Sequence, residues 1–437
     1  MFGYYLDLAL RSLGRNKVLT ALMVLAIAVG IGASMTTLTV FHVLSGDPIP
    51  QSSSKLFYVQ LDAENKSDYT PGEEPDIQLT RFDSETLLRD RKARRQAVMA
   101  GGAAPVQAGD GGTRGVDPFF ADVRYNSADF FSMFDVPFRY GEPWHEAEDD
   151  ARAHIAVISD ELNQKLFGGG DSTGRTLRLS GHDLRIVGVL APWKLAPRFY
   201  DLNSHGSYSD TEMAFVPYST SRDLKLGRTG TMSCWGDAGG EPSALMAPCT
   251  WLQYWVQLDT PDEVRNYRQY LEAYSDRQRA AGRFERPTNV RLRSVMEWLD
   301  FNKVVPNDVR LQLWLAFGFL LVCLVNTVGL LLAKCMKRAP EIGVRRALGA
   351  SRREIFVQFL VEAGVVGLAG GALGLLLALG GLWVVRHNPA QYASLAHLDA
   401  EMMLATFALA LVASLLAGLL PAWRACGVTP AIQLKSQ

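Results

Sequence analysis

The sequence predicts an α-helical membrane protein with four transmembrane helices and one large exported α+β domain. Four apolar stretches are each long enough to cross a bilayer, whose hydrocarbon core takes roughly 20 residues of helix. They are residues 18–43, 311–333, 363–385 and 402–422. A long region of ordinary soluble character separates the first stretch from the second. At 437 residues the chain exceeds the size at which one hydrophobic core stops growing, so more than one domain is expected.

Lysine and arginine residues gather on one side of these spans. Arg11, Arg15 and Lys17 precede the first span, and Arg424 and Lys435 follow the last. Because cytoplasmic loops carry the excess of positive charge, both termini are expected in the cytoplasm and residues 46–310 outside it. We therefore expect a multi-pass protein of the bacterial inner membrane with a large periplasmic domain. Seven further basic residues lie between the second and third spans: Lys334, Lys337, Arg338, Arg345, Arg346, Arg352 and Arg353.

The first apolar run is interpreted as an anchor rather than as a cleaved signal peptide. Its length exceeds the roughly 7–15 residues of a signal h-region, and no A-x-A-type site follows it. The preceding residues 1–16 form either an interfacial helix on the inner leaflet or a continuation of the first span. The expected segments are an interfacial helix at 1–16, a first span at 17–45, an exported core domain at 46–293, a stalk and second span at 294–333, a basic cytoplasmic loop at 334–355, a third span at 356–386, a fourth span at 402–423 and a cytoplasmic tail at 424–437.

The exported region has a mixed pattern of strands and helices. Alternating or apolar runs predict strands, and charged amphipathic runs such as 81–95 and 262–281 predict helices. The strands are expected at 56–62, around 122, at 154–158, 176–179, 184–190, 213–216, 251–258 and 289–293. Residues 191–248 are rich in Gly, Pro, Ser and Asp, which predicts a looped insertion.

Two of the five cysteines, Cys234 and Cys249, lie in the exported region. An oxidising compartment favours a disulfide between them, and closing such a loop stabilises the fold by about 3 kcal/mol in the chain-entropy model. Two free thiols are the alternative. Cys323 lies inside the second span, and Cys335 and Cys426 lie at cytoplasmic ends, where thiols stay reduced.

Small residues at four-residue spacing mark helix-packing faces in the first and third spans. Such steps let helix backbones approach closely in lipid, and they favour a bundle that dimerises. The glycines concerned are Gly30, Gly367, Gly370, Gly371 and Gly374. No span carries a charge near its middle, and we expect Glu362, near the inner edge of the third, to lie at the interface. This pattern disfavours a carrier with a polar route through the helices.

The apparent catalytic and metal-binding motifs lack the sequence context that such sites require. The loop 168–176, GGGDSTGRT, nearly matches a P-loop and a G-x-S-x-G motif, but both require strand, turn and helix in that order. Here the predicted order is helix, loop, strand. The seven histidines are scattered without metal-ligand spacing, and the chain has no Walker A motif. We expect no catalytic residue, no metal site and no nucleic-acid partner.

Several motifs resemble those of one family, the MacB/FtsX family of ABC-transporter permeases, which includes the LolC/LolE branch. Residues 340–351, PEIGVRRALGAS, closely resemble its signature after the second membrane helix, and Asn326 fits the pattern within that helix. The glycine-rich third span and the LPAWRA run at 420–425 are similar as well. In the exported region the resemblance is carried by residues 156–159, 166–168, 174–177 and 186–189.

The resemblance implies a periplasmic core domain with Porter-like and Sabre-like subdomains, the latter at about residues 140–250. It implies a dimer of ABC ATP-binding subunits as a separate partner that binds ATP and Mg²⁺, with no cofactor in this chain. A second permease copy or a paralogue, a periplasmic adaptor, an outer-membrane tunnel and membrane lipids are the further partners that it implies. Residues 191–248 match nothing known of the family, so the substrate and the adaptor stay open.

In this family the turn between the second and third spans is the coupling helix that contacts the ATP-binding subunit. Glu341 and Arg345 stand in a helix-stabilising order. The residues expected to make ATPase contact are Pro340, Glu341, Ile342, Gly343, Arg345, Arg346, Ala347, Leu348 and Gly349. A basic loop that only sets the topology is the alternative.

The sequence leaves three candidate functions. The first is a permease that couples ATP hydrolysis to motions of its periplasmic domain, with export or extraction of a substrate as the result. The second is an FtsX-like regulator that activates a cell-wall hydrolase. The third is a conventional pore or carrier, which the uncharged spans disfavour. The large exported region favours the first over the second.

Overall fold

The structure is a computed structural model of the chain. It describes residues 8–426, apart from 10, 13, 68, 110, 111, 114, 115, 205, 388–397 and 399 and the side chains of Ala425 and Cys426. The chain divides into two compact units. We call Met1–Ser45 with Val305–Gln437 the membrane unit and Gly46–Val304 the exported unit. The exported unit thus continues past the predicted boundary at residue 293. Most of the predicted interfacial helix and almost all of the tail lie outside the described residues.

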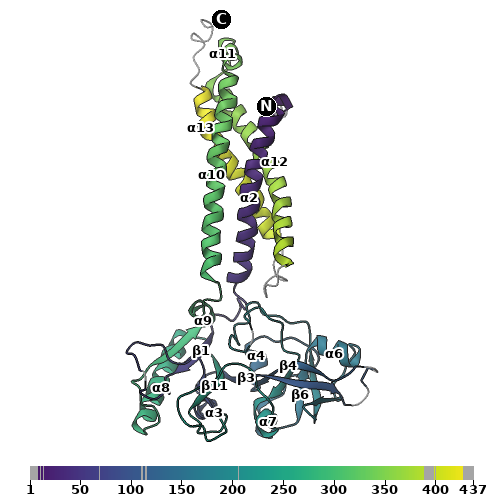
Figure 1. Cartoon of the computed structure of the whole chain (residues 1–437), viewed down its shortest axis with the longest axis vertical. Helices are drawn as coiled ribbons and strands as arrows, with labels where there is room; N and C mark the ends of the chain where they lie inside the picture. Colours follow the sequence, from purple (N-terminus) through teal and green to yellow (C-terminus); the bar gives the residue numbers. More distant parts are fainter. Residues whose placement is uncertain are drawn as a thin grey trace. The chain divides into compact units, whose positions relative to one another are not determined.

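In the part of the membrane unit that the structure describes, four long helices form a bundle, and the short helix α11 joins two of them (Figure 1). All four long helices have the length and apolar composition to cross a membrane, as predicted. Helix α12 packs against α2 and α13, and α10 packs against the same two helices. The bounds are α2 Lys17–Ser45, α10 Asn307–Lys337, α11 Ala339–Ala347, α12 Arg352–Arg386 and α13 Ala400–Cys426.

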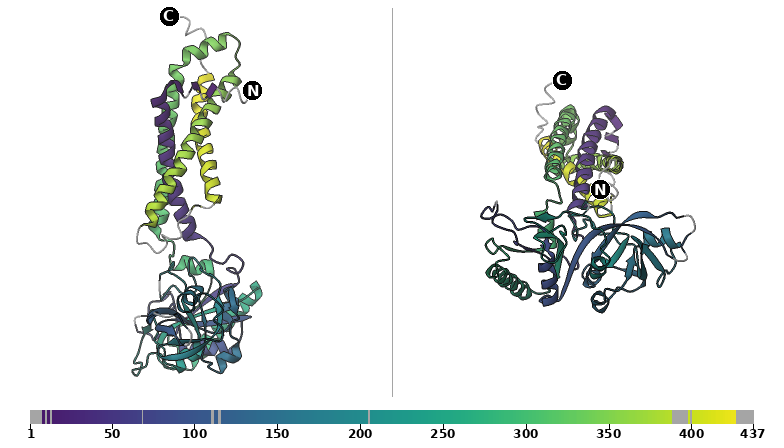
Figure 2. Two further views of the ribbon diagram at one scale, coloured as in Figure 1. Left: turned by 90° about the vertical axis from the view of Figure 1, so that its right-hand side faces the viewer. Right: turned by 60° about the horizontal axis from the view of Figure 1, so that its bottom comes forward.

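The predicted glycine faces lie where these helices approach most closely. A Cβ atom on Gly370 would lie 2.7 Å from Ile27 Cγ2, and one on Gly374 would lie 3.1 Å from the Ala28 carbonyl oxygen, so both glycines face α2. Gly367 and Gly371 face α13 instead. Gly30 of α2 lies against Leu320 and Cys323 of α10. Figure 2 shows α12 crossing α2, the geometry that small residues at four-residue spacing permit.

The exported unit is built on one mixed sheet in the order β12-β1-β11-β3-β4-β9-β6-β8-β5. Pairings β4–β9 and β6–β8 are parallel and the others along this path are antiparallel. The strands are β1 Leu56–Leu61, β2 Leu79–Thr80, β3 Arg95–Ala108, β4 Phe119–Asn126, β5 Phe138–Gly141, β6 Ile155–Ile158, β7 Thr176–Leu179, β8 His182–Leu190, β9 Ala214–Pro217, β10 Ser233–Cys234, β11 Cys249–Gln257 and β12 Val290–Ser294.

Seven helices belong to the exported unit, among the residues described. They are α3 Arg81–Asp90, α4 Asp129–Met133, α5 Glu146–Asp150, α6 Asp160–Phe167, α7 Tyr218–Asp223, α8 Pro261–Ala280 and α9 Val295–Phe301. Side-chain caps start several of them, as in α6, where Ser159 accepts a hydrogen bond from the Leu162 amide. The stalk is interrupted near Pro306, as the sequence predicts: α9 ends at Phe301, and Pro306 precedes α10 as its N-cap.

The longest strand, β3, is one that the sequence pattern does not predict. Its sequence RQAVMAGGAAPVQA has two glycines and a proline, which are all poor strand residues. The glycines are explained by packing: a Cβ atom on Gly102 would collide with the Tyr125 ring, and one on Gly101 would collide with Ser204 and Thr229. These close contacts require glycine, and the glycines remove the sequence pattern from which a strand would be predicted.

Candidate functional site

The predicted coupling segment is a helix between two turns, not an open loop. Helix α10 runs to Lys337, past the predicted end of the second span at residue 333. Arg338 then serves both as the C-cap of α10 and as the N-cap of α11, and Pro340 lies in the first turn of α11, where proline is tolerated. After α11, Gly349 adopts a φ of +103°, a conformation that favours glycine. Ser351 and Glu354 then form a capping box that starts α12.

One face of α11 is anchored within the membrane unit. Ile342 is buried in an apolar cluster with Cys335, Ile355, Phe359 and Ala422, which come from α10, α12 and α13. Gly343 is buried as well. Both residues face the chain's own helices, and burial of the isoleucine side chain stabilises that packing. Their expected contact with a partner stays a prediction.

The opposite face of α11 is exposed. It includes the predicted contact residues Pro340, Glu341, Ala347, Leu348 and Gly349. Leu348 is 83% exposed and Val344 is 53% exposed, and the nearby Met336 of α10 is 75% exposed. In a membrane protein such exposed apolar side chains are covered by another molecule, either lipid, as on the four long helices, or a protein partner.

The charged residues of α11 are partly paired inside the membrane unit. Glu341 accepts a hydrogen bond from Arg345 at 2.9 Å, the predicted i,i+4 pair, and lies 3.5 Å from Arg15. Arg345 also donates to Gln358 of α12 at 3.3 Å. Arg345 and Arg346 are both half-buried. Arg345 therefore fixes the orientation of α11 against α12. Glu341 keeps its carboxylate exposed at the surface of α11.

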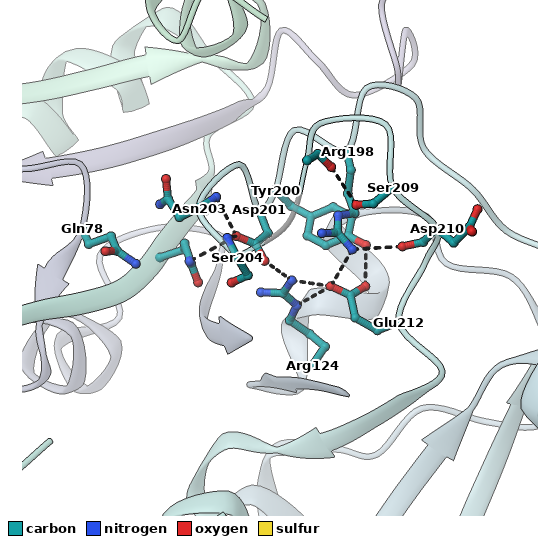
Figure 3. A network of polar contacts seen from close by, with 12 residues as sticks. Gln78, Arg124, Arg198, Tyr200, Asp201, Asn203, Ser204, Ser209, Asp210 and Glu212 are labelled. Atoms are coloured by element: carbon teal, nitrogen blue, oxygen red, sulfur yellow. Dashed lines mark hydrogen bonds and ion pairs between the residues drawn. The ribbon is translucent and has the colours of Figure 1, made fainter. Parts of the chain in front are cut away.

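The insertion at 191–248 is tied to the sheet by a buried ionic cluster, which the sequence did not reveal (Figure 3). Arg124 of β4 lies between the carboxylates of Asp201 and Glu212 and forms ion pairs with both. Arg198 lies 3.3 Å from Glu212, and the Tyr200 hydroxyl donates to Glu212 at 2.8 Å. In the sequence, the only indication of this cluster was one arginine, Arg124, among the apolar residues of strand β4.

The arginines of this cluster lower the pKa values of its two carboxyl groups. Burial raises the pKa of Asp201, but the adjacent Arg124 and Arg198 outweigh it and hold the pKa well below its usual range. The same two arginines lower the pKa of Glu212 against the opposing effect of burial. Both carboxylates are therefore ionised throughout the physiological range, and the cluster is a fixed structural joint.

A disulfide closes the tip of the insertion. Cys234 of β10 and Cys249 of β11 are bonded at 2.04 Å, the pair that the sequence predicts. They lie directly opposite each other in the β10–β11 pairing. The bond therefore closes the loop between β10 and β11 at the point where β11 enters the sheet.

A polar cleft of about 670 Å³ lies between α3, α4, α5 and α7 of the exported unit. Its walls carry the ion pairs Arg222–Glu85 and Arg91–Glu146. Asp149 also lines it and accepts a hydrogen bond from the Ala128 amide at 2.7 Å. Burial, with a smaller contribution from the neighbouring Asp150 and Asp129, raises the pKa of Asp149 to about 7.

No group of three or more His, Cys, Asp or Glu side chains in the described part of the chain is arranged to hold a metal ion. The loop that resembles a P-loop follows α6 and leads into β7, the order of helix, loop and strand that the sequence predicts. In this loop the Ser172 hydroxyl donates to Asn163 of α6 at 2.7 Å. The serine is thereby committed to closing the loop on its helix.

Comparisons with known proteins assign both units to described families. Residues 20–274 match the MacB-like periplasmic core domain, and residues 313–430 match the FtsX-like permease C-terminal domain. A pyoverdine export ATP-binding/permease protein, PvdT, of Pseudomonas fluorescens is 25% identical over 97% of this chain and 58% of its own length. The macrolide export ATP-binding/permease protein MacB of Escherichia coli K12 is 24% identical over 86% of this chain and 52% of its own. The chain thus spans little more than half the length of these relatives.

Two solved structures resemble the exported unit. One is the periplasmic region of MacB from Actinobacillus actinomycetemcomitans, with 12% identity over 56% of this chain and 92% of that one and a TM-score of 0.36. The other is the extracellular domain of the transporter YknZ from Gram-positive bacteria, with 10% identity over 54% of this chain and 99% of that one and a TM-score of 0.35. With the two family matches and four membrane-length helices, the chain belongs to the MacB/FtsX-like family of ABC-transporter permeases and fits an inner-membrane protein with a large periplasmic domain.

Proposed function

We propose that this chain is the permease subunit of an ABC transporter of the MacB/LolC type. ATP and Mg²⁺ bind to an ATP-binding partner subunit outside these 437 residues, and the resulting movement reaches the exported unit through the membrane helices. The motion of the exported unit then drives export or extraction of a substrate from the periplasm or the outer leaflet. The chain itself is the non-catalytic subunit, and both of its termini lie in the cytoplasm.

The observation that carries this proposal is that one side of α11 is buried against the other membrane helices while its opposite side is exposed. Ile342 anchors the helix among α10, α12 and α13, while Leu348 and Val344 extend from its other side. A helix held in this way moves together with the bundle when force is applied to its exposed face. A basic loop that only sets topology needs neither the buried isoleucine nor the exposed leucine.

The membrane helices themselves favour motion over passage of a substrate. Residues 363–385 of α12 and 311–333 of α10 contain no charged side chain. Ion and solute pathways usually carry such groups. The energy of ATP is therefore proposed to reach the exported unit mechanically, with a second permease copy or a paralogue completing the complex.

The relatives suggest the further partners and the kind of cargo. PvdT is named for pyoverdine export and MacB for macrolide export, both as ATP-binding/permease proteins. For this chain we propose export of a substrate comparable to those two. A periplasmic adaptor and an outer-membrane tunnel are proposed to complete the route.

The proposal is tested with the exposed leucine of α11. The Leu348→Asp variant places a charge on the proposed ATPase-contact face, where desolvating it on docking costs several kcal/mol in principle. We expect this variant to fold and insert normally but to lose co-purification with the ATP-binding subunit and the ATPase activity of the complex. Leu245→Asp is the matched control, because Leu245 is an exposed leucine of the exported unit.

Undiminished ATPase activity and co-purification in Leu348→Asp would contradict the assignment of α11 as the coupling helix. Co-purification of the wild-type chain with a cell-wall hydrolase, in place of an adaptor, would instead favour the regulator function. Substrate flux through proteoliposomes that contain this chain alone would favour a pore or carrier.

A further inference from the structure

Glu362 is a carboxylate buried inside the membrane unit. It lies in the third turn of α12 and is 1% exposed, because the chain's own segments surround it; its expected depth at the inner edge of the membrane stays a prediction. Its neighbours along the helix are apolar: Val361 precedes it and Ala363, Gly364 and Val365 follow it. A buried ionised group in this setting is costly and persists only where partners compensate for it.

Three partners from two other segments of the chain surround the Glu362 carboxylate. Lys334 of α10 forms an ion pair with it and is itself 1% exposed. Arg338, the residue shared by the ends of α10 and α11, lies 3.5 Å away. The hydroxyl of Ser12, in the segment before α2, donates to Glu362 at 2.5 Å. Arg338 also donates to the Ser12 carbonyl oxygen at 3.4 Å, which closes the cluster.

The segments joined at Glu362 are those that lead to the exported unit. Helix α2 ends at Ser45, directly before the exported unit begins, and α10 begins at Asn307, shortly after it ends. Ser12 belongs to the segment that enters α2, and Lys334 lies in the last turn of α10. One carboxylate therefore contacts the inner ends of both connections and the residue from which α11 starts.

An ion or proton route is a poor explanation of this cluster. Such a route requires further ionisable groups along the helices, and residues 363–385 of α12 contain none. Stability alone is also a poor explanation, because a well-packed apolar replacement of a buried ion pair is often equally stable or more stable. What an ionic cluster adds is a defined position, since the ion pairs of Glu362 with Lys334 and Arg338 and its hydrogen bond from Ser12 require one arrangement of the helices.

We propose that Glu362 is a positioning residue that makes α11, α10 and the segment before α2 move as one body. This role rests on the proposed function, in which α11 receives movement from the ATP-binding subunit. Movement of α11 is then passed to Arg338 and Lys334, and through Glu362 to Ser12 and α12. Without the carboxylate, α11 still docks on the partner and stays continuous with α10, but α12 and the segment before α2 lose their charged link to it.

The test uses the complex of this chain with its ATP-binding subunit in lipid nanodiscs. Two quantities are measured: the ATPase rate, and the change in amide hydrogen exchange of residues 46–304 on addition of ATP and Mg²⁺. In Glu362→Gln we expect an ATPase rate within about twofold of the wild type and an exchange response reduced about fivefold or more, the lower end of ordinary allosteric coupling.

Two further variants separate positioning from simple folding. The exchanged pair Lys334→Glu with Glu362→Lys retains one charge of each sign but leaves Arg338 beside a second cation, so we expect it to restore the exchange response in part. Glu401→Gln is the matched control, because Glu401 is an exposed glutamate in the first turn of α13, and we expect it to leave both quantities unchanged.

The outcomes distinguish this role from the proposed function. A wild-type complex whose exported unit does not respond to ATP overturns the proposed function. A normal response in the wild type that persists in Glu362→Gln overturns the role of Glu362 alone. Joint loss of the ATPase rate and the exchange response in Glu362→Gln, without restoration by the exchanged pair, also overturns it, because that pattern belongs to a residue needed only for folding.

Discussion

Arg124 is the residue on which the attachment of the insertion to the sheet depends. Its guanidinium is fully buried and forms ion pairs with Asp201 and Glu212, and nothing else in the cluster replaces both contacts. Arg198 contacts only Glu212 among these two. Two carboxylates without their shared cation would be left in a low-dielectric interior, which is the costly way to break a buried ion pair.

We therefore predict that Arg124→Met lowers the free energy of unfolding of the exported unit by about 3–5 kcal/mol. The control is Arg178→Met, which removes a surface pair with Asp183 and is expected to cost less than about 1 kcal/mol. Denaturant unfolding of the full chain in detergent, followed by tryptophan fluorescence, measures both, because Trp255 donates a hydrogen bond to the Tyr200 carbonyl oxygen beside the cluster. Equal effects of the two substitutions would contradict the account.

Asp149 gives the exported unit a pH dependence near neutrality. Its folded-state pKa, raised to about 7 chiefly by burial, lies above the unfolded value of about 3.9. The folded protein therefore retains a proton that the unfolded chain releases, so the stability from this group falls as the pH rises from about 4 to 7. In Asp149→Asn, whose amide does not titrate, this part of the slope is expected to vanish. Thermal unfolding of wild type and variant between pH 4 and 8 measures the difference, and parallel curves would contradict it.

At the scale of the elements, the membrane helices could be predicted closely and the coupling segment only in part. Long uncharged runs determine a membrane helix almost by themselves, because no other backbone conformation satisfies its hydrogen bonds in lipid. The buried side of α11 was not predictable, because this short helix has apolar residues on more than one side. Which of them is buried depends on how α12 and α13 pack against it. The partners of Glu362 were not predictable for a related reason, since Lys334 and Arg338 are distant from it in sequence.

Within the exported unit, strands with regular apolar runs such as β1 and β11 were predictable, and β3 was not. The glycines of β3 serve close contacts made by residues far along the chain, including Ser204 and Thr229. Local propensity therefore opposed the structure at that strand. The cluster of Arg124, Asp201 and Glu212 was hidden in the same way, since its members lie on β4 and on the insertion.

Close packing of α12 on α13 gives a prediction for a single glycine. A Cβ atom on Gly367 would lie 2.0 Å from Ser414 Oγ and 3.1 Å from the Ala410 carbonyl oxygen, so Gly367→Ala forces the two helices apart. Overpacking of this kind typically costs about 1–3 kcal/mol. Gly380→Ala is the control in the same helix, because a Cβ atom there meets nothing within 4 Å. Thermal denaturation in detergent should show a lower midpoint for Gly367→Ala only, and an equal midpoint for both variants would contradict the packing.

At the scale of the whole molecule, we propose that a helix on the cytoplasmic side moves a domain on the other side without passing a substrate through the bundle. The membrane unit supplies an anchored α11 with an exposed leucine and a buried ionic cluster at Glu362. The exported unit supplies an α/β body whose insertion is fixed by Arg124 and the disulfide. Each unit is compact, and we propose that each moves as a body, as mechanical coupling requires.

The most direct test of this central claim is amide hydrogen exchange of the exported unit in the complex with the ATP-binding subunit, with and without ATP and Mg²⁺. The account predicts that ATP changes the exchange of residues 46–304 in the wild type and that Leu348→Asp abolishes this change. Unchanged exchange in a wild-type complex that hydrolyses ATP normally would contradict it.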